Sequence, residues 1–79
     1  MSTLADLSIG RTARVKNVGG SDEISVRLLE MGLTPGVEVT MLGAAPLGDP
    51  LEFEVRGYRL SVRRGEAARV EIVDPNVAS

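Results

Sequence analysis

Cysteine, histidine and tryptophan are all absent from this chain of 79 residues. Without cysteine there are no disulfides, thiolate nucleophiles or sulfur ligands for metals, which is typical of proteins in reducing compartments. Without histidine the chain lacks the commonest general base and the commonest ligand of transition metals. These two absences together argue against an enzyme and against a selective site for a transition metal.

Aromatic residues and long hydrophobic runs are also scarce. Phe53 and Tyr58 are the only aromatic residues, so the core of this single small domain must be built mainly from aliphatic side chains. No apolar run approaches the roughly 18 residues of a membrane span. Residues 1–7 lack the basic region and the apolar run of a secretory signal. We therefore expect a cytoplasmic protein that does not insert into a membrane.

Neither sign of charge dominates. Nine lysines and arginines against eleven aspartates and glutamates give a formal net charge of −2, which is too small to indicate nucleic acid or a membrane surface as partner. Arginines cluster between positions 56 and 69, but two of them, Arg59 and Arg63, share the predicted outer face of the strands with glutamates. Aromatic side chains for base stacking are also too few. We expect no nucleic-acid partner.

One helix is predicted over about residues 22–31. Ser21 and Asp22 supply oxygen atoms for its N-cap, and Gly32 is suited to end it. Two sides of this helix are apolar, and their residues are Ile24, Leu28 and Met31 against Val26 and Leu29. In one interpretation the N-terminal segment with Leu4 and Leu7 covers the second side. In the other, Leu29 contributes to a surface for a partner.

Five short strands are predicted from the alternation of apolar and polar residues. They cover residues 11–16, 37–42, 51–56, 58–63 and 69–73. Pro35 and Gly36 predict a type II turn before the second strand, and a short turn or one 3₁₀ turn is expected over residues 65–68. Mostly antiparallel strands in so short a chain imply a mostly β fold, a small and partly open barrel with one added helix.

Gly57 marks a hairpin between the strands at residues 51–56 and 58–63, and two registers keep its apolar faces matched. A loop of Arg56 and Gly57 places Glu54 opposite Arg59. A loop of Gly57 and Tyr58 instead places Arg56 opposite Arg59. Because like charges directly opposite each other are destabilising, the first register is favoured, although a type II′ turn with glycine first favours the second.

No residues in the sequence are assigned to a catalytic, metal or cofactor site. Glu52 and Glu54 alternate with apolar residues on a predicted strand, so they are expected in solvent, with one of them paired to Arg59. Oxygen ligands for a divalent cation exist in Glu38, Asp49 and these two glutamates, but nothing assigns a site. Neither of the glycine-rich phosphate-binding motifs occurs.

Three stretches of the sequence, residues 27–39, 45–50 and 55–63, read RLLEMGLTPGVEV, APLGDP and VRGYRLSVR. In this order they resemble the ferrous iron transport protein A (FeoA) family, and the resemblance extends from about Leu4 to Val73. It implies an SH3-like barrel with an added helix, one domain over residues 1–74 and a frayed tail over residues 75–79. The polar start and this tail suggest a complete, stand-alone protein.

For function, the resemblance implies a non-catalytic, cytoplasmic accessory of bacterial ferrous iron uptake. Its implied partner is a FeoB-type membrane transporter with a cytosolic G-protein part. The chain itself is expected to carry no cofactor, with weak or indirect Fe(II) association left open. The alternative is a regulatory module of a DtxR-type metal-dependent repressor, since a similar domain is appended to those proteins. That alternative requires a DNA-binding domain that this sequence does not contain.

Six residues are the candidates for contact with a partner. They are Leu29, Pro46, Leu47, Gly48, Asp49 and Arg59. Residues 43–50 form the one substantial predicted loop, and loops on rigid scaffolds often carry recognition. Charge reversal at Arg59 or Asp49 is expected to weaken partner binding more than folding. The oligomeric state stays open.

Overall fold

Alternating side chains build one antiparallel sheet in the computed structural model, which describes residues 2–73. Met1 and residues 74–79, which include the predicted tail, lie outside the described residues. The strands are β1 (Ser2–Thr3), β2 (Thr12–Val18), β3 (Glu38–Ala44), β4 (Leu51–Val55), β5 (Tyr58–Val62) and β6 (Val70–Val73). They follow the order β1-β6-β2-β3-β4-β5, and β1 does not pair with β5, so the sheet curls without closing.

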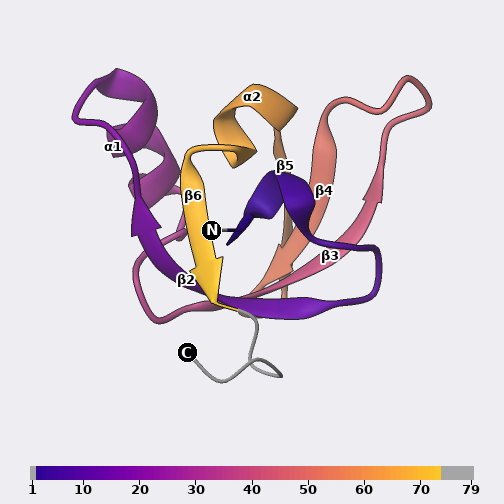
Figure 1. Cartoon of the computed structure of the whole chain (residues 1–79). Helices are drawn as coiled ribbons and strands as arrows, with labels where there is room; N and C mark the ends of the chain where they lie inside the picture. The colour runs from indigo at the N-terminus through magenta and orange to yellow at the C-terminus, as the bar shows by residue number, and fades with distance from the viewer. Residues whose placement is uncertain (1, 74–79) are drawn as a thin grey trace.

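Three short helical segments complete the fold: η1 (Leu4–Asp6), α1 (Glu23–Glu30) and α2 (Arg64–Ala67). Figure 1 shows that α1, α2 and the loop between β3 and β4 all rise from the same side of the curled sheet. This arrangement gives the molecule three raised features, with α2 between the other two. The mostly β, partly open barrel with one main helix is therefore confirmed.

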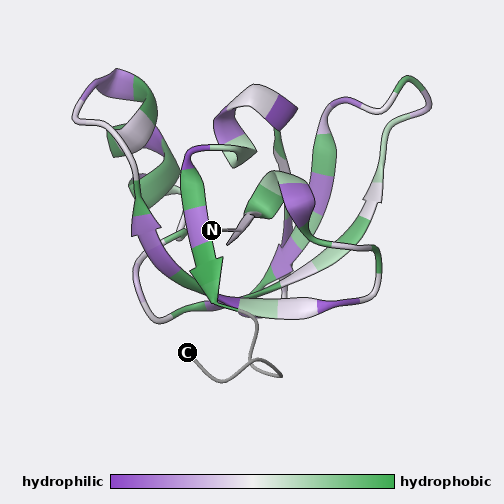
Figure 2. Cartoon of the chain, viewed as in Figure 1, coloured by the Kyte–Doolittle hydropathy of each residue, from purple (hydrophilic) through white to green (hydrophobic). Residues whose placement is uncertain are grey.

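The core lies on the inner face of the sheet. Apolar and polar residues alternate along the strands (Figure 2), and the apolar ones point inward. Phe53 is its largest fully buried side chain, and the others are almost all aliphatic, including Leu4, Leu28, Leu33, Leu51, Val15, Val39, Val55, Val62 and Val70. An aliphatic core was expected from the shortage of aromatic residues.

The predicted helix begins and ends close to its predicted limits. The carboxylate of Asp22 accepts a hydrogen bond of 3.2 Å from the backbone N–H of Ser25, which satisfies a free donor at the helix start. Gly32 has a φ of +107°, and the N–H of Leu33 then donates to the carbonyl of Leu28 over 3.2 Å. This pattern is a Schellman ending, in which glycine adopts the left-handed conformation at low cost.

The hairpin between β4 and β5 has the register that charge pairing favours. Glu54 lies opposite Arg59, and the loop consists of Arg56 and Gly57. Both loop residues have positive φ, +52° and +86°, so the turn is type I′ and not the type II′ turn that argued for the other register. The type II turn at residues 34–36 is also present, because the Val37 N–H donates to the carbonyl of Thr34 and Gly36, at the third position of the turn, has a φ of +93°.

Several features differ from the sequence-based expectation. The strand predicted at residues 37–42 continues to Ala44, so the predicted loop at residues 43–50 is shorter than expected. A sixth strand is present, since Ser2 and Thr3 pair with β6, and the strand predicted at residues 11–16 extends to Val18. The expected turn over residues 65–68 is the helix α2, which begins at Arg64. The interpretation in which Leu4 and Leu7 cover the second side of α1 is wrong, because η1 packs beside α2 and β6. Val26 and Leu29 consequently remain 52% and 38% exposed.

Candidate functional site

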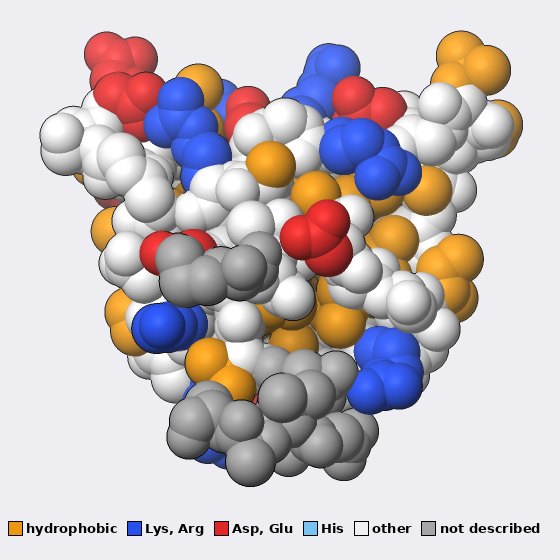
Figure 3. Space-filling model, in the orientation of Figure 1, with side chains coloured by type: hydrophobic (Ala, Val, Ile, Leu, Met, Phe, Trp, Pro, Cys, Tyr) orange, Lys and Arg blue, Asp and Glu red, His pale blue; other side chains and the backbone are white. Residues whose placement is uncertain are grey.

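The loop between β3 and β4 is a short turn with a leucine at its tip. The N–H of Gly48 donates to the carbonyl of Ala45 over 2.7 Å, and the N–H of Ala45 donates to the carbonyl of Pro50 over 3.0 Å. Pro46 occupies the second position of this turn, where its fixed φ is favourable. Leu47 follows it and is 97% exposed. In Figure 3 the upper right corner, where Figure 1 shows the loop between β3 and β4, carries exposed hydrophobic atoms.

This loop is fastened to α2 from both the backbone and a side chain. The carboxylate of Asp49 accepts a hydrogen bond of 2.9 Å from the backbone N–H of Arg64, at the first turn of α2. The guanidinium of Arg64 donates to the carbonyl of Gly48 from two nitrogens, over 3.2 Å and 3.0 Å. Hydrogen bonds to charged groups are stronger than neutral ones, so the loop is held in one conformation. Asp49 thus has a structural contact besides its predicted role.

Two ion pairs hold α1 to the segment that contains α2. Arg27 pairs with Glu66, and Asp22 pairs with Arg69 over 2.6 Å. They anchor the helix on the side that faces α2 and leave Val26 and Leu29 on its exposed surface. The helix and the loop are therefore both fixed to α2, one on each side of it (Figure 1).

Asp22 is the one group among the described residues with a clearly shifted acidity. The hydrogen bond from the Arg69 guanidinium, followed by that from the Ser25 backbone N–H, lowers the pKa of Asp22 to about 2. Both interactions favour the charged carboxylate. Since Asp22 is the N-cap of α1, the contacts that fix the start of the helix account for this shift.

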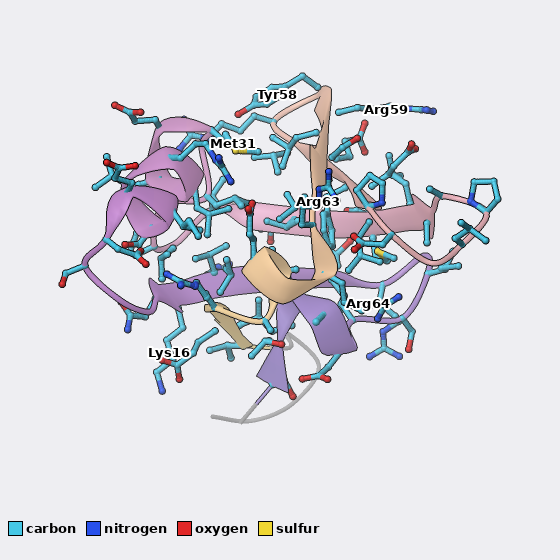
Figure 4. The ribbon with its side chains drawn as sticks, turned by 90° about the horizontal axis from the view of Figure 1, so that it is seen from above. Lys16, Met31, Tyr58, Arg59, Arg63 and Arg64 are labelled. Carbon is cyan, nitrogen blue, oxygen red and sulfur yellow. The ribbon has the colours of Figure 1, made fainter. Side chains whose placement is uncertain are left out.

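Arg59 lies on β5, and its side chain is exposed on the outer face of the sheet. Figure 4 shows it directed away from Met31, toward which Tyr58 points. The six candidates therefore do not form one continuous patch. Pro46, Leu47, Gly48 and Asp49 lie together, whereas Leu29 is on α1 at the other side of α2.

Two contacts that organise this region were not predicted from the sequence. Arg64 holds the loop, and Tyr58 donates from its hydroxyl to the carbonyl of Met31 over 2.6 Å. Both join residues 15 or more positions apart, and local pattern carries no information on such pairs. An exposed tyrosine beside a hairpin glycine was the only available signal for the second.

Carboxylates in the described range 2–73 are dispersed and do not gather at one site. No three acidic side chains there lie close enough together to hold a metal ion. Glu38 pairs with Arg14 over 3.6 Å, and Glu54 lies opposite Arg59. A surface hollow of about 470 Å³ on the outer face is bordered by Thr12 and Thr40, whose hydroxyls form a hydrogen bond of 2.8 Å with each other.

No helix within residues 2–73 is long and apolar enough to cross a membrane.

Comparison with known proteins relates the chain to iron transport. The model of the FeoA domain family matches residues 2–74. The Fe(2+) transport protein A/Fe(2+) transporter FeoB fusion protein of Porphyromonas gingivalis is 36% identical to the chain over 69 residues. The match covers 87% of this chain and 8% of that fusion protein, so the chain corresponds to a small part of its relative.

Two solved structures have the same fold over almost the whole chain. Iron(II) transport protein A of Clostridium thermocellum has a TM-score of 0.88 and 32% identity, with 94% of this chain and 46% of that chain covered. A Stenotrophomonas maltophilia protein, described as a prokaryotic SH3 domain protein complexed with zinc, has a TM-score of 0.81 and 35% identity, with 92% and 91% covered. The SH3-like fold that the sequence resemblance implied is thereby confirmed.

Proposed function

The chain belongs to the FeoA domain family, and from this premise we propose that it is a non-catalytic accessory of ferrous iron uptake that contacts a FeoB-type transporter. One observation carries the proposal: in the relative from Porphyromonas gingivalis, the region similar to this chain and a FeoB transporter are parts of one fusion protein. Domains joined in one chain are held at high effective concentration, which is useful when the separate proteins must associate.

The chemistry of the side chains supports an action on the transporter and not on iron. Fe(II) is bound well by imidazole and thiolate ligands, and the sequence contains neither histidine nor cysteine. Two of the carboxylates that remain, Glu38 and Asp49, are engaged with Arg14 and with the backbone of Arg64. We therefore propose that the protein needs no cofactor of its own.

The loop at Leu47 is the part of the surface best suited to a protein contact. An apolar side chain that is 97% exposed loses this exposure on binding, which is favourable by the hydrophobic effect. Hydrogen bonds from Arg64 and Gly48 already order the loop, so little conformational entropy is lost when a partner binds. We propose Leu47 as an anchor residue, with Leu29 and Arg59 in separate contacts.

A cytoplasmic location follows from the proposed partner. The region of FeoB-type transporters that the resemblance implies as partner is their cytosolic G-protein part. The protein would then act at the inner face of the membrane, where it is recruited by protein contact without inserting into lipid.

Measurement of Fe(II) uptake tests the proposal. Cells that lack the gene should take up less radiolabelled Fe(II), and expression of the unchanged chain should restore uptake. A Leu47→Ser variant should restore less, while an Ile9→Ser variant, changed at another exposed apolar residue, should restore uptake fully. Unchanged uptake in the deletion strain would contradict the proposal. Recovery of a DNA-binding repressor with the tagged chain would favour the regulatory alternative.

A further inference from the structure

β5 is an edge strand with one unpaired side. The sheet order ends with β4 and then β5, so among the described residues β5 pairs with β4 alone. β4 is also the only element in extended contact with it among residues 2–73. Figure 4 shows Tyr58, Arg59 and Arg63 along this strand and just after it.

The register fixes which backbone groups face the open side. In a two-residue type I′ hairpin, the residues that flank the loop form a hydrogen-bonded pair, here Val55 and Tyr58. Tyr58, Leu60 and Val62 therefore direct their N–H and C=O groups toward β4. Arg59 and Ser61 direct theirs away from β4, and no backbone or side-chain partner for them exists in the described part of the chain.

The open side faces solvent. Buried backbone N–H and C=O groups are nearly always hydrogen-bonded, so unpaired groups indicate contact with water. Arg59 and Ser61 are both exposed. The series of unpaired backbone groups stops at the end of β5, since the carbonyl of Arg63 accepts hydrogen bonds from the N–H groups of Glu66 and Ala67 in α2.

Side chains beside this edge are cationic on one face and apolar on the other. Arg59 and Arg63 lie on the outer face, and within residues 2–73 no ion pair or hydrogen bond engages either guanidinium. Pairing with β4 ends at Val62, so Arg63 has no residue of β4 opposite it. On the inner face, Tyr58 is 44% exposed and Leu60 is half-buried against the core.

A second copy of β5 is a poor occupant of this edge. Antiparallel pairing of two β5 strands about Ser61 would place Arg59 of each copy opposite Arg63 of the other. Like charges directly opposite each other are destabilising, and arginines of this kind protect edge strands from self-association. The same arginines favour a strand with carboxylates at the matching positions.

We propose that the open edge of β5 binds an extended segment of a partner protein in which acidic and apolar residues alternate. The segment would add a strand to the sheet, with backbone hydrogen bonds to Arg59 and Ser61. Its acidic side chains would lie beside Arg59 and Arg63, and its apolar side chains beside Tyr58 and Leu60. The inference deepens the proposed function and rests on it, because it describes how the partner is held.

Titration with a synthetic peptide tests this inference. The probe is an acetylated and amidated heptapeptide that alternates valine and glutamate, added to the ¹⁵N-labelled protein and followed by NMR. We expect chemical-shift changes and slower hydrogen exchange at the amides of Arg59 and Ser61, and not at Leu60. A double variant Arg59→Glu/Arg63→Glu should bind this peptide roughly tenfold more weakly. Shifts confined to another surface, or none at millimolar peptide, would overturn the inference.

A backbone variant separates strand addition from simple charge attraction. Ser61→Pro removes an N–H that faces away from β4, and proline is tolerated on such an edge. This variant should lose peptide binding, whereas Ser61→Ala should keep it. If Ser61→Pro does not fold, a peptide N-methylated at its central residues replaces it and should not bind. Equal binding of methylated and unmodified peptides would overturn the inference.

Failure of this inference can be told apart from failure of the proposed function. If a folded Ser61→Pro variant still retains a FeoB-type transporter as well as the unchanged chain does, the edge is not the contact and the proposed function stands. If the unchanged chain retains no transporter but binds the peptide with the expected amide protection, the proposed function fails and the edge remains a peptide-binding surface.

Discussion

The hydroxyl of Tyr58 donates a hydrogen bond of 2.6 Å to the carbonyl of Met31, which joins the start of β5 to the end of α1. The last carbonyls of a helix have no partner within the helix, so this bond satisfies one of them. Gly32 lies at the same point, and a Cβ added to it would overlap with the Tyr58 hydroxyl. The helix end and the hairpin are therefore fitted to each other.

Replacement of Tyr58 by phenylalanine should destabilise the protein modestly. The variant loses one hydrogen bond, worth about 0.5–1.5 kcal/mol, and the lower end is expected because Tyr58 is 44% exposed and water can reach the Met31 carbonyl. For a domain of this size, 1 kcal/mol corresponds to a fall in Tm of roughly 4–8 °C. Thermal unfolding followed by circular dichroism measures it. An unchanged Tm would show that the bond contributes nothing.

Gly32→Ala and Tyr58→Phe should not be additive. Alanine at position 32 must adopt a φ of +107° and also displaces the Tyr58 hydroxyl. In the Tyr58→Phe background the hydroxyl is absent, so only the backbone cost of about 1–2 kcal/mol remains. Urea unfolding of the two single variants and the double variant should give a coupling energy of about 0.5–1.5 kcal/mol. Additive effects would mean that the two residues are energetically independent.

Arg56 in the type I′ turn has an unfavourable backbone conformation that a substitution can relieve. Arg56 has a φ of +52°, which is unfavourable for a residue with a long side chain and favourable for asparagine. Arg56→Asn should therefore raise the free energy of unfolding by about 1 kcal/mol. Gly57→Ala is the matched control, because a Cβ there meets no atom within 4 Å and its cost is purely conformational. A stability loss in Arg56→Asn would show that the arginine side chain makes a stabilising contact.

Acid should weaken the contact between the start of α1 and Arg69. The folded-state pKa of Asp22, about 2, lies below the ordinary value near 3.9 of an unfolded chain. The stabilisation from this group is therefore complete above that ordinary value and is lost as the pH falls toward about 2. NMR titration of the Asp22 carboxyl should show the low pKa, and Arg69→Met should raise it. Ordinary titration in the unchanged protein would contradict this contact.

Local pattern in the sequence was sufficient for the elements that depend on neighbouring residues. The N-cap at Asp22 and the end at Gly32 follow from side-chain and backbone preferences within one turn. The hairpin register followed from one charge comparison, Glu54 opposite Arg59 and not Arg56 opposite Arg59.

Long-range contacts were the part that the sequence did not predict. β1 consists of Ser2 and Thr3, which pair with β6 through backbone groups about 70 positions away and carry no apolar pattern. The contact of Asp49 with the backbone of Arg64 depends on the path of the whole hairpin. For the candidate site, sequence composition indicated the loop, but its rigid attachment to α2 and the unpaired edge of β5 required the fold.

Affinity capture from membranes tests whether the protein contacts a FeoB-type transporter. The tagged chain, incubated with detergent-solubilised membranes of its own host, should retain a FeoB-type transporter that mass spectrometry identifies. Leu47→Ser should retain at least about tenfold less, the loss expected when an interface anchor is truncated, and Ile9→Ser should retain as much as the unchanged chain. Retention of no transporter by the unchanged, folded chain would rule out this contact.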